Sequence, residues 1–236
     1  MEPSSARPRG LTGNQLKILA LVCMTADHVG LQLLPQVPLL RLIGRLAFPI
    51  YGWMIAEGCR HTHDRKGYLL RLAGLAAVCQ AVYFVAMGSV YQCVLVTFSL
   101  SVVLICALDR AAASPGTGNR LAVCLLGLGV VFVTECLPGL LPRWDYAVDY
   151  GIWGVLLPVG VYLGRSRAEK LALLTLSLIG LGLSYGGIQW LALAAVPVLA
   201  LYNGTRGKYR IGRLFYWYYP GHLAAIYGIS LLISLF

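Results

Sequence analysis

The sequence predicts an all-α protein, a polytopic transmembrane helical bundle. Of its 236 residues, 58% are hydrophobic and only 12% are charged, against about 25% charged residues in soluble domains. The mean hydropathy is +0.74. A soluble fold of this length cannot bury so much apolar surface, because the area of a folded chain grows too quickly with its size. Composition therefore excludes disorder, a disulfide scaffold, collagen and a nucleic-acid-binding domain, and it makes the lipid bilayer the expected partner.

Apolar runs between prolines, glycines and charge clusters indicate the number of spans. A helix rises about 1.5 Å per residue, so it needs about 20 residues to cross about 30 Å of hydrocarbon. On this basis we expect about nine spans, within a range of about eight to ten. Their ranges are 16–34, 39–57, 68–87, 94–108, 121–137, 151–163, 171–183, 188–201 and 214–236. We expect residues 1–14 to form a polar tail and 15–236 a single transmembrane domain.

Basic residues indicate how the spans are oriented. With the N-terminus inside, all but three of the 19 Lys and Arg residues fall in cytoplasmic segments. Two of these three lie within the second run, and Arg143 lies in an outer loop. The positive-inside rule therefore predicts a cytoplasmic N-terminus and, for nine spans, an external C-terminus. The formal charge of +10 is explained by this orientation.

The seven cysteines are dispersed and form no CxxC or CxxH motif. Most of them lie inside apolar runs, where cysteine behaves as a small hydrophobic residue. We therefore expect neither a metal site nor a redox site.

Ionisable residues inside the predicted spans are the candidates for chemistry. Each costs about 2.5–3.5 kcal/mol at the centre of a bilayer, so such groups usually face a partner or a polar cavity. Counting about 1.5 Å per residue places four of them near the same depth: Asp27, His28, Arg45 and His222. Arg41 and Arg45 are four residues apart and share one helix face.

These residue types suit two kinds of chemistry. A buried histidine is a good general base near neutral pH, a carboxylate can fix its tautomer, and an arginine can stabilise an oxyanion. Together they favour acyl transfer to an amine or a hydroxyl. The same groups also suit a proton relay in a small transporter. Alternatively, Asp27 serves only as an ion-pair partner that neutralises Arg45.

Short motifs follow one another in a definite order along nearly the whole chain. They are Leu16-Lys17-Ile18-Leu19 leading to Asp27-His28, Leu40 to Ile50 with Ala56-Glu57-Gly58, His61-Thr62, Tyr68 to Arg71, Asp149-Tyr150-Gly151 with Gly154, Leu201 to Gly204 with Arg206-Gly207, and Tyr216-Trp217 through Pro220 to His222. From about residue 15 to 230 this series resembles the TraX family of polytopic bacterial inner-membrane proteins. Gln92-Cys93 departs from the family pattern, in which an Asn is expected.

The resemblance implies a multi-pass protein of the bacterial cytoplasmic membrane and an acetyltransferase. The type member of the family is linked to N-terminal acetylation of pilin, and the family looks related to membrane acyltransferases that use acetyl-CoA. Acetyl-CoA is therefore the expected co-substrate, with no metal. The expected acceptor is an amine or hydroxyl, a pilin N-terminus or another envelope molecule.

The resemblance and the ionisable residues together suggest a role for each candidate. As catalytic residues, we expect His28 to deprotonate the acceptor or to carry the acetyl group, Asp27 or Asp149 to orient it, and Arg45 to stabilise the oxyanion. The expected CoA-binding residues are Arg41, Glu57, Arg71, Tyr202, Asn203, Arg206 and Tyr216, all but Arg41 within or near the basic loops 60–71 and 206–213. The expected acceptor-binding residues are Asp149, Tyr150 and His222. The alternatives are a proton-coupled transporter and a non-catalytic assembly factor.

Overall fold

The protein is all-helical over the residues that the structure, a computed structural model, describes. These are residues 10–208 and 212–234, and the side chains at 86, 87, 212–216 and 234 are outside that description. Within them the extended pairing is limited to two isolated β-bridges. The elements are α1(Gly13–Gln32), α2(Pro38–Gly44), α3(Ala47–His61), α4(Arg65–Met87), α5(Val94–Ala113), α6(Thr117–Val131), the π-helix η1(Phe132–Cys136), α7(Leu137–Leu140), α8(Gly151–Leu163), α9(Arg167–Tyr185), the 3-10 helix η2(Gly187–Ala194), α10(Ala195–Ala200) and α11(Gly212–Ser234).

Contacts divide the chain into two compact units. The first unit is Met1–Tyr51 with Leu191–Phe236, and the second unit is Gly52–Trp190. The boundaries fall inside α3 and η2. This division into units does not test the expected single transmembrane domain over residues 15–236, which stays a prediction.

In the first unit, α1 packs against α2 and α11. The helix α1 begins with a capping box, in which the Thr12 side chain accepts from the Gln15 backbone and Gln15 bonds back to the Thr12 backbone. This arrangement satisfies two N–H groups that have no partner inside the helix. The core contains Cys23, Met24 and Ala47. Aliphatic and tyrosine side chains close around them: Leu19, Leu46, Tyr51, Tyr218 and Tyr219.

The close approach of α1 and α2 depends on glycines. A Cβ at Gly30 would lie 2.8 Å from the Cβ of Leu40, and a Cβ at Gly44 would overlap the Asp27 side chain. Small residues allow helix backbones to approach closely, which is how many helices associate within membranes. Proline at the first position of α2 fits the start of a helix, where its missing N–H has no partner to lose.

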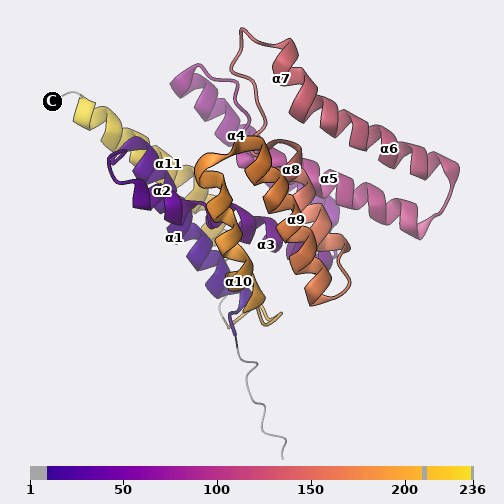
Figure 1. The fold of residues 1–236 in the computed structure, drawn as a ribbon. Coiled ribbons are helices and arrows are strands. Elements are labelled where there is room, and N and C mark those ends of the chain that lie inside the picture. The colour runs from indigo at the N-terminus through magenta and orange to yellow at the C-terminus, as the bar shows by residue number, and fades with distance from the viewer. Residues whose placement is uncertain (1–9, 209–211, 235–236) are drawn as a thin grey trace, which may run out of the picture. The chain divides into compact units, whose positions relative to one another are not determined.

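In the second unit, α5 contacts α4, α6 and α8, and α8 packs along α9, as Figure 1 shows. The packed side chains are mostly aliphatic. Val102 and Ile105 of α5, Leu157 of α8 and Leu174 and Leu178 of α9 are fully buried. At Gly180 the backbone of α9 approaches the ring of Trp153, so this glycine sets the distance between α8 and α9.

Within the part of the chain that the structure describes, five helical stretches are long and apolar enough to cross a membrane: Pro38–His61, Arg65–Val85, Val94–Ala113, Thr117–Leu140 and Arg167–Tyr185. The protein is therefore an integral membrane protein. The expected count was nine, and each of the nine expected runs does contain helix. Two of them are short, Gly151–Leu163 and Gly187–Ala200. The first and the last, α1 and α11, are long but are interrupted by polar side chains, so the nine-span topology stays a prediction.

Candidate functional site

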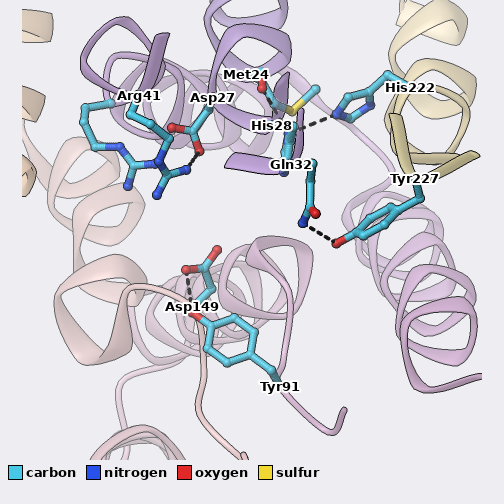
Figure 2. A network of polar contacts seen from close by, with 10 residues as sticks. Met24, Asp27, His28, Gln32, Arg41, Tyr91, Asp149, His222 and Tyr227 are labelled. Carbon is cyan, nitrogen blue, oxygen red and sulfur yellow. Dashed lines mark hydrogen bonds and ion pairs between the residues drawn. The ribbon is translucent and has the colours of Figure 1, made fainter. Parts of the chain in front are cut away.

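Asp27 lies between the two arginines of the second predicted span. Its Oδ2 accepts a hydrogen bond of 2.8 Å from Nη1 of Arg41, and its Oδ1 accepts from Nη2 of Arg45. All three side chains are largely buried, with relative exposures of 16% for Asp27, 26% for Arg41 and 10% for Arg45. Figure 2 shows the Asp27 carboxylate directed at Arg41. Local structure explains the geometry, because α1 carries Asp27, α2 carries Arg41 and Arg45 caps α2.

Counted over these three residues, one carboxylate and two guanidinium groups give a formal charge of +1. Charges interact strongly in a low-dielectric region, and burying an uncompensated one is costly. The Asp27–Arg41–Arg45 cluster is therefore suited to attract an anionic group or a developing negative charge.

His28 and His222 form a hydrogen-bonded pair. Nε2 of His222 lies 3.2 Å from Nδ1 of His28, although the residues are 194 positions apart in the chain. Their ring centroids are 5.0 Å apart, and Figure 2 shows the ring of His222 reaching from α11 toward His28 on α1. His222 is buried, whereas His28 is half-buried.

Backbone carbonyls determine which ring nitrogen carries the proton. Nδ1 of His222 lies 2.9 Å from the carbonyl oxygen of Tyr218, and Nδ1 of His28 lies 3.0 Å from that of Met24. A carbonyl oxygen only accepts, so both Nδ1 atoms carry hydrogen when the rings are neutral. Nε2 of His222 then accepts from His28. Nε2 of His28 keeps its lone pair, and no hydrogen bond to it occurs within the described residues.

Aromatic and polar side chains hold the histidine pair. The ring of His222 stacks on Tyr218 with centroids 5.2 Å apart and meets the edge of Tyr219 at 5.6 Å. The Tyr218 hydroxyl lies 2.7 Å from Oγ1 of Thr25. One turn beyond His28 on α1, the side-chain amide of Gln32 donates to the Tyr227 hydroxyl at 3.2 Å. Together with the His28–His222 bond, these contacts tie α1 to α11 around Nε2 of His28.

Asn203 and its neighbours hold the start of α1. The backbone N–H of Asn203 donates to Leu11 at 2.9 Å, and its Oδ1 accepts from the backbone and hydroxyl of Thr205. Tyr202 forms a β-bridge with Leu11, and the carbonyl oxygen of Arg206 accepts from Asn14 at 3.0 Å. The structure therefore places Tyr202, Asn203 and Arg206, three of the predicted CoA-binding residues, in a loop that anchors α1.

Asp149 and Tyr150 lie in the second unit, just before α8. The Tyr91 hydroxyl donates to Oδ1 of Asp149 at 2.9 Å (Figure 2). Burial and then the neighbouring Asp149 carboxylate raise the pKa of the Tyr91 phenol, so this group remains a donor at ordinary pH. Tyr150 has a left-handed backbone with φ of 63°, which is unusual for a residue with a side chain. Both residues shape the start of α8.

Glu57 and Arg71 make different ion pairs within the second unit. Oε1 of Glu57 lies 2.9 Å from Nζ of Lys170, and both side chains are mostly buried. Arg71 lies 3.9 Å from Asp64, and both are well exposed.

The side chain of Tyr216, the remaining predicted CoA-binding residue, lies outside the described residues. Among those that are described, no group of three or more His, Cys, Asp or Glu residues could hold a metal ion.

Comparison with known proteins identifies the family. The model of the TraX protein family matches residues 12–230, a range that includes every candidate residue from Asp27 to His222. The chain belongs to the TraX family. It is 26% identical to a probable fimbrial assembly protein FimC of Dichelobacter nodosus over 90% of this chain and 93% of that protein. It is 28% identical to protein TraX of Escherichia coli over 67% of this chain and 60% of that protein. No solved structure is significantly similar.

The structure of this TraX-family protein brings together five of the predicted residues and adds others. Asp27, His28, Arg41, Arg45 and His222 all lie in the first unit. The contacts that orient His28 come from Met24 and His222, while Asp27 bonds the arginines. Sequence reasoning missed the roles of Met24, Thr25, Gln32, Tyr218 and Tyr227. A signal was available for Met24 and Tyr218, because each precedes a histidine by four residues on a helix.

Proposed function

We propose that this TraX-family protein is a membrane-embedded acetyltransferase that moves an acetyl group from cytosolic acetyl-CoA to an amine or hydroxyl acceptor. The observation that carries the proposal is the free lone pair on Nε2 of His28, whose Nδ1–H is held by Met24 and His222. An oriented imidazole with one free nitrogen is the usual arrangement of a general base.

The transfer step follows from these contacts. Nε2 of His28 removes a proton from the acceptor while the acceptor attacks the thioester carbonyl. The carbon–sulfur bond then breaks, and the imidazolium returns the proton to the departing thiolate, so His28 ends the cycle neutral. During the step His222 stabilises the imidazolium, because its Nε2 accepts the Nδ1–H of His28.

The Asp27–Arg41–Arg45 cluster supplies positive charge to the same unit. The tetrahedral intermediate of acyl transfer carries an oxyanion, which fixed positive groups stabilise strongly in a dry site. The excess charge of the cluster suits this role or that of holding an anionic part of a substrate. Asp27 keeps both arginines in place and limits the excess to a single charge.

The relatives suggest the class of acceptor. One of them is named a probable fimbrial assembly protein, and fimbriae are built from pilin subunits. We therefore propose a pilin-type polypeptide amine as the acceptor. The proposal places the protein in the bacterial inner membrane with its N-terminus in the cytoplasm, where acetyl-CoA is available.

The replacement His28→Ala tests this function in the purified protein. We expect acetyl transfer to fall by about 10²–10⁴-fold, the usual contribution of a general base, while CoA binding stays nearly unchanged. His63→Ala is the matched control, because His63 is an exposed loop residue. Release of free CoA thiol measures the reaction and ligand-dependent thermal stability measures binding. Full activity of the His28→Ala protein would overturn the mechanism.

A proton-coupled transporter is the second candidate, and the His28–His222 hydrogen bond is what favours it. Two bonded imidazoles can pass a proton between them, which is the element a relay needs. A transporter moves its substrate across vesicles in response to a pH gradient without acetyl-CoA. Flux measured in proteoliposomes without the nucleotide distinguishes it from the enzyme.

A further inference from the structure

A cavity of about 380 Å³ lies in the second unit, where α8 ends and α9 begins. Its lining is Arg60, Tyr162, Leu163, Gly164 and Arg165. It differs from the histidine site, which belongs to the first unit. Ligand pockets usually measure about 300–1,000 Å³, so this cavity is large enough for part of a ligand such as its phosphate groups.

Arg60 contributes a fixed positive charge to the cavity wall. Its Nη2 donates to the carbonyl oxygens of Val161 at 3.3 Å, of Gly164 at 2.6 Å and of Tyr162. These carbonyls close the C-terminal end of α8. Among the described residues no carboxylate pairs with Arg60, and its buried Nε makes no hydrogen bond. The guanidinium is therefore held rigidly while its charge is met only by backbone dipoles.

Tyr162 forms a second wall that is also fixed. Its hydroxyl donates to both carboxylate oxygens of Asp109, at 2.9 and 2.8 Å, and accepts from Nη2 of Arg65 at 3.0 Å. The guanidinium groups of Arg60 and Arg65 lie 5.4 and 5.7 Å from the centre of the ring. Asp109 neutralises Arg65 through an ion pair, which leaves the charge of Arg60 in excess.

Arg165 adds an exposed guanidinium on the loop before α9. The nearby carboxylate of Glu169 accepts the backbone N–H of Arg165 at 2.8 Å, and Ser166 caps the first turn of α9. Glu169 therefore lies beside Arg165 and offsets part of its charge. Gly164 lets the loop pass close to α9, because a Cβ there would lie 2.8 Å from the backbone nitrogen of Lys170.

We infer that this cavity binds the phosphate groups of an anionic ligand, with Arg60 and Arg165 as the recognising residues. Arginine donates several N–H groups in a planar fork that matches phosphate geometry. Arg60 is anchored through its Nη2 and can donate from Nη1, and the exposed Arg165 supplies a second guanidinium at the same opening. If the phosphates belong to CoA, the inference rests on the proposed function and names the residues that hold the donor. An anionic lipid headgroup offers the same chemistry.

Equilibrium binding to the full-length purified protein tests the inference with two probes, CoA and phosphatidylglycerol. The variant is Arg165→Gln, because Arg165 is exposed and its loss should leave the fold intact. Arg167→Gln is the matched control, since it removes the same charge two residues away and does not line the cavity. CoA affinity is measured calorimetrically at physiological salt, and lipid retention is measured by native mass spectrometry.

We expect one of the two probes to bind the wild type and Arg167→Gln with equal affinity. Its affinity for Arg165→Gln should be about tenfold lower, the usual effect of losing a hydrogen bond to a charged group. If CoA shows this pattern, the ligand is a nucleotide. If CoA does not bind the wild type but phosphatidylglycerol shows the pattern, the donor of the proposed function fails and the phosphate site stands. Unchanged binding to Arg165→Gln, or no binding of either probe to the wild type, overturns the inference.

Discussion

The Asp27 side chain can serve both stability and chemistry. It accepts hydrogen bonds from two mostly buried arginines, Arg41 and Arg45. Removing one partner of a buried ion pair is far more damaging than replacing both, because an uncompensated charge remains. The two sides of this cluster should therefore respond very differently to neutralisation.

We predict that Asp27→Asn lowers the free energy of unfolding by about 3–5 kcal/mol, because two buried guanidinium groups lose their counter-charge. Arg41→Gln should cost only about 1 kcal/mol, since it leaves a one-to-one pair between Asp27 and Arg45. Reversible unfolding of the detergent-solubilised variants measures both values. Equal losses in the two variants would show that the charge balance does not govern stability here.

The sequence indicated which ionisable residues lie inside the spans, but not how they contact one another. The spacing of Arg41 and Arg45 places them on one helix face, and the structure shows both on Asp27. The bond between His28 and His222 joins residues 194 positions apart, so it depends on how α1 meets α11. Local spacing carries no information on such a contact. Asp27 or Asp149 was expected to orient His28, with an ion pair to Arg45 as the alternative for Asp27. The structure shows Asp27 bonded to both arginines, which are strong electrostatic partners for a carboxylate.

Gly44 sets how closely α1 packs against α2. A methyl group at this position would overlap the Asp27 side chain, so the glycine is required by the ion pair. We predict that Gly44→Ala destabilises the protein by about 1–3 kcal/mol, the usual cost of overpacking. Gly127→Ala is the control, because a Cβ there meets nothing within 4 Å and alanine favours a helix. Comparable destabilisation in both variants would contradict this account of the interface.

Asp145 ties the two loops that precede α5 and α8. Its carboxylate accepts from the Ser89 hydroxyl and, at 2.9 Å, from the backbone N–H of Val90. These hydrogen bonds, that from Ser89 first, lower the pKa of the Asp145 carboxyl. Because the folded pKa lies below the unfolded one, the unfolded chain binds the proton more readily. The tie therefore stabilises the fold above about pH 4, the ordinary range of an aspartate, and is lost as the pH falls.

We predict that Asp145→Asn lowers the melting temperature at pH 7 and that the gap to the wild type narrows toward pH 3. Thermal unfolding in one detergent across this pH range measures the gap. A gap that stays constant with pH would mean that the ionised form of Asp145 contributes nothing to the tie.

Helices were predictable where apolar runs are continuous, and their interruptions were not. Each of the nine expected runs contains helix, but the second is divided at Arg45 into α2 and α3. The fifth ends in a π-helix that carries Glu135, whose Oε1 accepts the N–H of Ile152 at 2.7 Å. Such interruptions depend on tertiary hydrogen bonds at the ends of other helices, which hydropathy does not report.

Polarity is distributed unevenly over the whole molecule. The two long helices that carry the histidine pair, α1 and α11, are absent from the five stretches that are apolar enough to span. Functional polar groups lower the hydropathy of the helices that hold them, so a site inside a membrane weakens the signal by which its helices are found. This explains why composition predicted the membrane class, whereas hydropathy identifies five of the nine predicted spans among the described residues.

Orientation is the prediction that links these helices to a cytosolic donor. The stretch Thr117–Leu140 is the most apolar of the five, so residues on either side of it should lie on opposite faces of the membrane. In a protein without its natural cysteines, we expect an impermeant maleimide to label Arg143→Cys in intact spheroplasts and to label Ser114→Cys only after the membrane is opened. Labelling of both variants from one side would mean that this stretch does not span. Reversed labelling would place the basic loops outside, where acetyl-CoA is absent, and the proposed transfer reaction would lose its donor.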